Sequence, residues 1–80
     1  MTRLLPLTYR EVVRHVRALG FVFDRQAKGS HEIWYNPDTH RRVTIPHHPG
    51  TVPTGTLRAI IRETGLTVDE FLSAKEARSE

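Results

Sequence analysis

The sequence predicts one α+β domain in which a three-stranded antiparallel sheet carries two main helices on one face. Two observations lead to this prediction. Apolar side chains recur at helical spacing near both ends of the chain. Between them lie short β-branched and aromatic segments, joined by turns too short for crossover connections. The length of 80 residues allows a single domain, 1–80, and residues 75–80 are expected to fray as a polar tail.

The first helix is expected over residues 9–19. Thr8 can cap its amino end while Glu11 reaches back to the backbone N–H of Thr8, which is the capping-box pattern. Gly20 then supplies the left-handed residue that ends a helix. One apolar face is formed by Tyr9, Val12, Val13, Val16 and Leu19.

Three strands are expected next, over residues 21–23, 31–35 and 41–45, with turns at 27–30 and 36–39. Each strand segment is rich in β-branched or aromatic residues, and each turn contains Gly or Pro. Connections of this length join antiparallel hairpins, so the three strands form a meander.

The face occupied by each side chain of the middle strand stays open at this stage. His31, Ile33 and Tyr35 share one phase of the strand, and Glu32 and Trp34 share the other. One of the two aromatic rings belongs to the core. The other lies on the open face of the sheet, where it could stack on a base or on a protein partner.

The remaining chain is expected to form a loop over 47–53, a second helix and a short third helix. Gly65 ends the second helix, and Thr67 and Glu70 form another capping box at the start of the third. This element order is the layout of the double-stranded-RNA-binding-domain fold, which leaves one sheet face open to solvent. The apolar face of the second helix is formed by Leu57, Ile60, Ile61 and Thr64.

Composition narrows the class of function. The absence of cysteine excludes a disulfide scaffold, a Cys-ligated zinc site and a Cys nucleophile. No apolar run approaches the ~20 residues that span a bilayer, so no membrane partner is expected and the compartment is the cytoplasm. Residues 1–68 carry ten cations and five anions, a net charge of +5. A small basic body predicts an anionic partner, with nucleic acid as the first candidate.

The strongest candidate for chemistry is the run Lys28, Gly29, Ser30 and His31 at a hairpin turn. The turn amides, the Lys28 ammonium and the Ser30 hydroxyl can hold a phosphate. The imidazole of His31 can act as a general acid or base. On residue types alone, an ordinary turn followed by a half-buried histidine remains the simpler interpretation.

Arginine side chains extend the candidate RNA-binding surface. Arg41, Arg42 and Arg58 are selected because the expected fold places them beside the turn and loop near His31. A further row on the first helix is interpreted as the solvent side of that helix. This row is Arg10, Arg14 and Arg17.

A metal site is a weaker hypothesis. His47 and His48 could join His31, His40 or Asp38 around an ion. Adjacent side chains in an extended segment point in opposite directions, so two neighbours rarely ligate the same metal. A solvated loop is the preferred interpretation.

Four short motifs follow one another in a specific order and spacing. They are Leu19-Gly20-Phe21, Lys28 to His31, Arg42 to Pro46 with His48, and Gly55-Thr56-Leu57 through Ile60 to Gly65. Together they resemble the HicA toxins, over residues 9–72. The resemblance implies the double-stranded-RNA-binding-domain-like fold and the activity of an mRNA interferase, an endoribonuclease that needs no metal cofactor.

The resemblance also implies partners and roles. A HicB-like antitoxin would bind and mask the toxin, and the histidine of the Gly-Ser-His motif, His31, would be catalytic. Lys28, the Gly29 and Ser30 amides and nearby arginines would position the scissile phosphate of mRNA. The chain departs from the family at Thr54, where relatives often have lysine.

Three alternatives remain beside the nuclease. The first is a non-catalytic RNA-binding module of the same fold, which would not need His31. The second is a subunit whose main role is to bind an antitoxin-like partner, and the third is a metal-dependent nuclease. The sequence leaves both a homo-oligomer and a toxin–antitoxin hetero-oligomer open.

Overall fold

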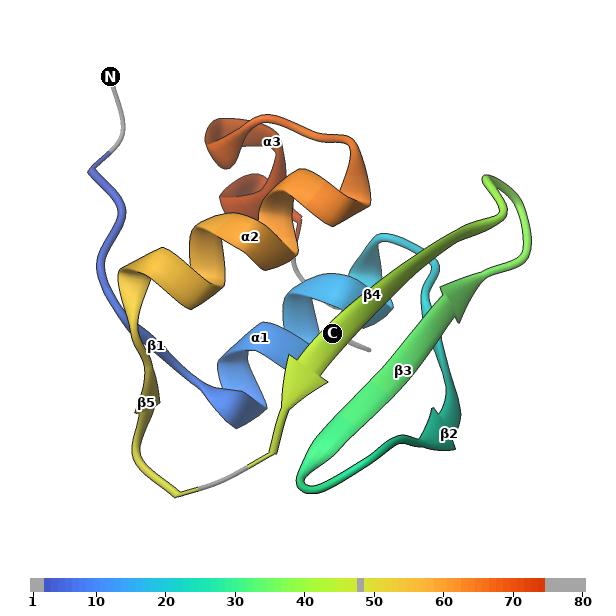
Figure 1. Cartoon of the computed structure of the whole chain (residues 1–80). Coiled ribbons are helices and arrows are strands. Elements are labelled where there is room, and N and C mark those ends of the chain that lie inside the picture. Colours follow the sequence, from blue (N-terminus) through green and yellow to red (C-terminus); the bar gives the residue numbers. More distant parts are fainter. Residues whose placement is uncertain (1–2, 48, 75–80) are drawn as a thin grey trace, which may run out of the picture.

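The computed structural model describes residues 3–47 and 49–74 and confirms the α+β architecture (Figure 1). His48 and the polar tail at 75–80 lie outside the described residues. The elements in chain order are β1 (Leu7–Thr8), α1 (Tyr9–Ala18), β2 (Val22–Gln26), β3 (His31–Asn36), β4 (Arg41–Pro46), β5 (Thr51–Val52), α2 (Thr54–Thr64) and α3 (Val68–Ser73).

Both predicted capping boxes are present. The Thr8 hydroxyl accepts a hydrogen bond from the Glu11 N–H at 3.1 Å, and Glu11 Oε1 accepts one from the Thr8 N–H at 2.8 Å. The hydrogen bond from the Thr8 backbone is the main reason why the pKa of Glu11 lies below its ordinary value. Thr67 and Glu70 repeat this arrangement at the start of α3.

The main sheet has the strand order β2–β3–β4, with both pairs antiparallel. The prediction for β2 was too short, because this strand runs from Val22 to Gln26. A register shift between Phe23 and Arg25 marks a bulge, and pairing resumes beyond it with Gln26 opposite Glu32. The predicted boundary depended on aromatic and β-branched composition, and the residues that extend the strand, Asp24, Arg25 and Gln26, are polar.

The core lies between the sheet and the helices, which gather on one side of it (Figure 1). Trp34 is 3% exposed and belongs to this core, whereas Tyr35 lies on the opposite, open face. This settles the phase of β3: Glu32 and Trp34 point inward, and His31 points outward. The other buried apolar residues are Val12, Val16, Phe21, Val43, Ile45, Val52, Leu57, Ile60, Ile61 and Phe71.

A second, two-stranded sheet corrects the expectation that 47–53 is only a loop. β5 pairs antiparallel with β1, with Leu7 opposite Val52 and Thr8 opposite Thr51. The sequence could not predict this pairing, because two-residue strands have no periodicity and their partners are far apart in the chain. The pairing brings the segment after β4 alongside the start of α1.

Candidate functional site

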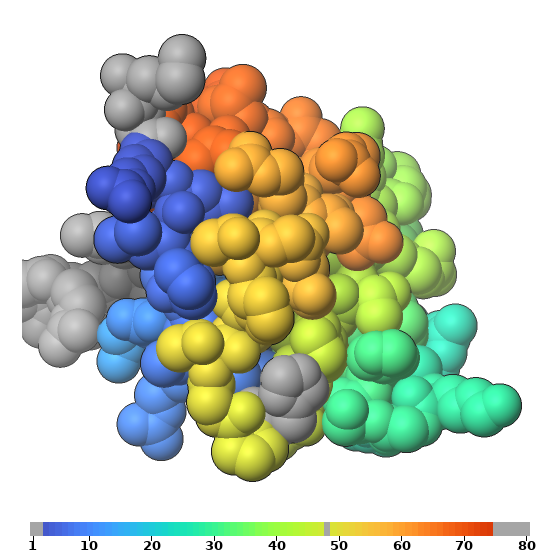
Figure 2. Space-filling view, turned by 60° about the vertical axis from the view of Figure 1, so that its left-hand side comes forward, coloured from blue at the N-terminus to red at the C-terminus, as the bar shows by residue number. Residues whose placement is uncertain are grey.

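The β2–β3 turn holds its four candidate residues on the surface, and it projects from one corner of the molecule (Figure 2, turquoise-green). Gly29 adopts φ 68°, a left-handed conformation that favours glycine. The turn is closed by a hydrogen bond from the Ala27 N–H to the His31 carbonyl at 2.7 Å. Within the described residues, the backbone N–H groups of Gly29 and Ser30 donate no hydrogen bond, so they remain available to an anion.

His31 is exposed rather than half-buried, which corrects the simpler interpretation of this residue. It begins β3, pairs with Pro46 on β4, and its side chain lies on the open face of the sheet. The Ser30 carbonyl accepts a hydrogen bond from the His47 N–H at 2.8 Å, which attaches the turn to the end of β4. The structure therefore offers an accessible imidazole beside the unpaired turn amides.

Arg41 and Arg42 do not flank His31, contrary to the prediction. They pair with Asn36 and Tyr35 at the other end of the hairpin. Five residues separate the two ends, which corresponds to ~16 Å along the strand. Hairpin register decides this placement, since β4 runs antiparallel to β3 and begins where β3 ends.

The two arginines also have partners of their own. Arg41 donates to the Glu63 carbonyl at 3.2 Å, and the Arg42 guanidinium lies 4.5 Å from the ring centre of Tyr35. Arg58 is exposed on α2, an element that packs against β4. None of these contacts brings an arginine into the β2–β3 turn.

The residues considered for a metal site are also dispersed. His40 donates to or accepts from the Tyr35 hydroxyl at 2.9 Å, at the end of the hairpin opposite His31. Among residues 3–47 and 49–74, no three His, Cys, Asp or Glu side chains are grouped as a metal site would require. His48 lies outside this range.

A buried carboxylate forms a polar cluster that the sequence analysis did not identify. Glu32 is only 7% exposed, and its Oε1 accepts hydrogen bonds from the Tyr9 hydroxyl at 2.7 Å and from Trp34 Nε1 at 3.2 Å. Its Oε2 lies 3.0 Å from His47 Nδ1. We call these four residues, Tyr9, Glu32, Trp34 and His47, the Glu32 cluster. Every polar atom of the carboxylate is thus paired, as a buried charge requires.

The Glu32 cluster changes the chemistry of its members. Burial, followed by the hydrogen bond to Glu32 and the charge of Glu32, raises the pKa of Tyr9 to about 12. Tyr9 therefore stays a hydrogen-bond donor throughout the neutral range. His47 must donate through Nδ1 to the carboxylate, which leaves Nε2 for an external partner.

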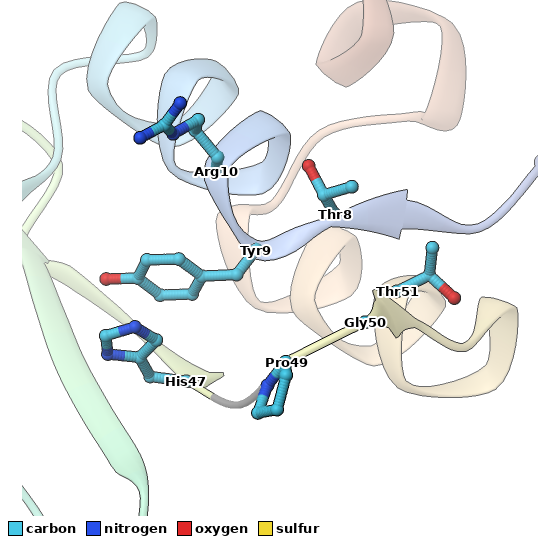
Figure 3. A pocket seen from close by; sticks show the side chains of 7 residues that line it. All are labelled: Thr8, Tyr9, Arg10, His47, Pro49, Gly50 and Thr51. Atoms are coloured by element: carbon cyan, nitrogen blue, oxygen red, sulfur yellow. The ribbon is translucent and has the colours of Figure 1, made fainter.

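The rings of Tyr9 and His47 are stacked, with centroids 3.9 Å apart and an interplanar angle of 12°. Figure 3 shows the two rings side by side, with the α1 residue Arg10 beyond Tyr9. The stack adjoins two surface hollows, of about 570 and 540 Å³. The first hollow is lined by Thr8, Tyr9, Arg10, His47, Pro49, Gly50 and Thr51. The second is lined by Tyr9, Arg10, Val13, Arg14, Arg17 and His47.

Only a weak sequence pattern could have indicated this cluster. Glu32 shares the phase of Trp34, so a core position for Trp34 implies an acidic residue facing the core. The donors to Glu32 come from the start of α1 and the end of β4, and their approach depends on the β1–β5 pairing.

The helix–three-strand–helix order and the open sheet face define a domain with the double-stranded-RNA-binding-domain-like fold. A family model described as the HicA toxin of bacterial toxin–antitoxin systems matches residues 9–66, and the chain belongs to this family. A comparison with curated proteins finds no match. In the part of the chain that is described, no helix is long and apolar enough to cross a membrane.

Proposed function

We propose that this chain is the toxin of a type II toxin–antitoxin system and cleaves mRNA in the cytoplasm as a metal-independent endoribonuclease. One observation carries the proposal: the exposed imidazole of His31 stands beside a turn with unpaired amides and the Lys28 ammonium. Membership of a toxin family supports it. An antitoxin resembling HicB is the expected protein partner.

The proposed reaction uses the ribose 2′-hydroxyl as the nucleophile. His31 accepts the proton of this hydroxyl, its oxygen attacks the adjacent phosphorus, and the bond from phosphorus to the 5′-oxygen breaks. The leaving 5′-oxygen takes up a proton, from the imidazolium or from water. Lys28 and the N–H groups of Gly29 and Ser30 stabilise the charge that develops on the phosphoryl oxygens. The products carry a 2′,3′-cyclic phosphate or, after hydrolysis, a 3′-phosphate.

The arginines have a different role in this scheme. Because Arg41 and Arg42 lie at the far end of the hairpin, they would contact RNA phosphates several nucleotides from the scissile bond. Arg58 on α2 would likewise bind the strand away from the reacting phosphate. These residues therefore contribute to RNA affinity rather than to the chemical step.

A second candidate, a non-catalytic RNA-binding module, is favoured by one observation. The His31 side chain makes no hydrogen bond within the described residues. Catalytic imidazoles are generally oriented by a second group, and here RNA itself would have to provide that orientation.

The deciding experiment incubates purified protein with a defined mRNA fragment in the presence of a chelator and identifies the ends of the products. Wild type should yield cyclic or 3′-phosphate ends, and His31→Ala should yield none. His40→Asn is the matched control, since it removes an imidazole at the other end of the hairpin and asparagine tolerates the φ of 64° found there. Ends with a 3′-hydroxyl would exclude the 2′-hydroxyl route, and RNA binding without cleavage would favour the second candidate.

A further inference from the structure

The hollow beside α1 is lined by an unusual concentration of cationic side chains. Arg10, Arg14 and Arg17 follow one another at intervals of four and three residues, so they share one side of the helix. His47 completes the lining from the end of β4. The sequence alone suggested only a solvent-facing row, but the structure closes this row into a concave surface.

The three arginines differ in how their guanidinium groups are engaged. Arg17 lies over the Trp34 ring, 5.5 Å from its centre, and is thereby held in place. In contrast, the guanidinium groups of Arg10 and Arg14 form no hydrogen bond or ion pair within residues 3–47 and 49–74. The nearby Glu11 carboxylate is occupied by the capping box at Thr8. Arg14 acts on that carboxylate only through its charge, which helps to lower the pKa of Glu11, so the guanidinium donors of Arg10 and Arg14 remain available to an anion.

The imidazole of His47 is oriented toward a ligand. Its Nδ1 is bound to Glu32 Oε2 at 3.0 Å, and its ring is held against Tyr9. The side chain is nevertheless 54% exposed, so Nε2 remains accessible. With Nδ1 bound to Glu32, Nε2 is the ring nitrogen left to contact a ligand.

We propose that this hollow is a phosphate-binding subsite for the RNA strand, in which the Arg10 and Arg14 guanidinium groups bind phosphodiester oxygens and His47 Nε2 contacts the strand. The proposal rests on the proposed function, because it assigns an additional contact to the same substrate. Glu32 and Tyr9 act as positioning residues that hold the imidazole.

Phosphate fits this lining better than the carboxylates of an acidic protein. Guanidinium forks bind phosphate through paired hydrogen bonds. Arg10 and Arg14 are ~6 Å apart along the helix axis, which is comparable with the distance between successive phosphates of a single strand. The hollow adjoins the end of β4, which is attached to the turn that holds the scissile phosphate in the proposed reaction. One RNA strand can therefore reach both places.

The test measures the binding of a fluorescently labelled single-stranded RNA to the full chain carrying His31→Ala, which prevents cleavage. Adding Arg14→Gln should raise the dissociation constant about tenfold or more, as expected for a lost charge-assisted contact. The slope of log K against log salt should become shallower by about 0.7. Arg62→Gln on the exposed side of α2 is the matched control with the same change of charge, and it should leave both values nearly unchanged.

A second readout concerns His47. The groups that face its ring are Glu32 from β3 and Tyr9 and Arg10 from α1. His47→Ala should raise the dissociation constant for the labelled RNA several-fold, because the contact between the imidazole and the strand is lost. His40→Asn should leave this constant nearly unchanged.

The outcomes separate the proposal from the proposed function. If Arg14→Gln and Arg62→Gln bind RNA equally while wild type still cleaves it, the subsite is wrong and the nuclease stands. If Arg14→Gln weakens only a complex with an acidic antitoxin, the hollow is a protein contact and the proposal is overturned. If no variant binds RNA and wild type does not cleave it, the proposed function itself fails.

Discussion

His31 and Glu32 are neighbours in the sequence, yet they lie in opposite environments. His31 is exposed on the open face, beside a turn whose amides are unpaired. Glu32 is buried on the helix side, and both of its oxygens are paired with Tyr9, Trp34 and His47. Strand geometry alone separates them, since successive side chains alternate between faces.

The difference shows how one strand can combine reactivity with rigidity. At its exposed end the strand keeps the His31 imidazole free for a substrate, so a substitution of His31 should change activity and leave stability almost unaffected. The buried side uses its polar groups internally, so substitutions there should change stability first.

The largest expected effect is on catalysis. His31→Ala should lower the rate of RNA cleavage by ~10²–10⁴-fold, which is the usual contribution of a general acid or base. Its free energy of unfolding should stay within ~0.5 kcal/mol of wild type, because the side chain is exposed. Cleavage assays and denaturant unfolding on the same preparation measure the cleavage rate and the free energy of unfolding. A large loss of stability would mean that His31 is structural and that the two regions are not distinct.

The second largest effect is expected on stability, at the buried residue Glu32. Glu32→Ala should lower the free energy of unfolding by ~1–3 kcal/mol, because it leaves the buried Trp34 N–H and the Tyr9 hydroxyl without their acceptor. Thermal or urea unfolding measures the change. Glu63→Ala, which removes an exposed carboxylate that accepts from the Thr44 N–H, is the comparison and should cost less. Equal costs would contradict the assignment of Glu32 as the organising group of the cluster.

A smaller effect is expected at the turn. Gly29→Ala should cost ~1 kcal/mol, because alanine must adopt the left-handed φ of 68°, while its Cβ would meet no atom within 4 Å. Gly29→Asn should cost less, since asparagine tolerates this conformation. Unfolding measurements distinguish backbone strain from steric clash. If both variants were strongly destabilised, the turn would be packed rather than open.

The smallest effect appears only at high pH. The pKa of Tyr9 is raised to about 12, so the stability that it contributes is fully present below pH 10 and is lost as the pH rises toward 12. Wild type should therefore lose more stability over this range than Tyr9→Phe, which cannot ionise. Unfolding free energies at pH 9, 10 and 11 give the comparison. Parallel curves would show that the hydroxyl is not held by Glu32.

Much of the fold was predictable because its determinants are local. The capping boxes at Thr8 and Thr67 and the left-handed stop at Gly65 mark helix ends within a few residues of sequence. The turns of the meander identified the three strands in the same way. The bulge in β2 and the β1–β5 pairing were not predicted, because neither produces a periodic pattern of apolar residues in the sequence.

The candidate site was predictable only in part. The turn from Lys28 to His31 is contiguous in the sequence, so it could be selected as a candidate, although residue types alone favoured an ordinary turn and the resemblance to a toxin family supplied the catalytic role. Arg41 and Arg42 were assigned to the wrong end of the hairpin, because residue type does not report strand register. Their proposed role in RNA binding stays a prediction.

By itself, the sequence determined the order of the helices and of the three main strands, the basic charge and the Gly-Ser-His turn, since each depends on neighbouring residues. The tertiary structure alone decided that Trp34 faces the core, that Glu32 meets His47, and that the α1 arginines line a hollow. Such contacts join segments from three parts of the chain. They form because burial of the apolar faces of α1 and β3 also removes the neighbouring polar groups from water. Those polar groups must then form hydrogen bonds with each other.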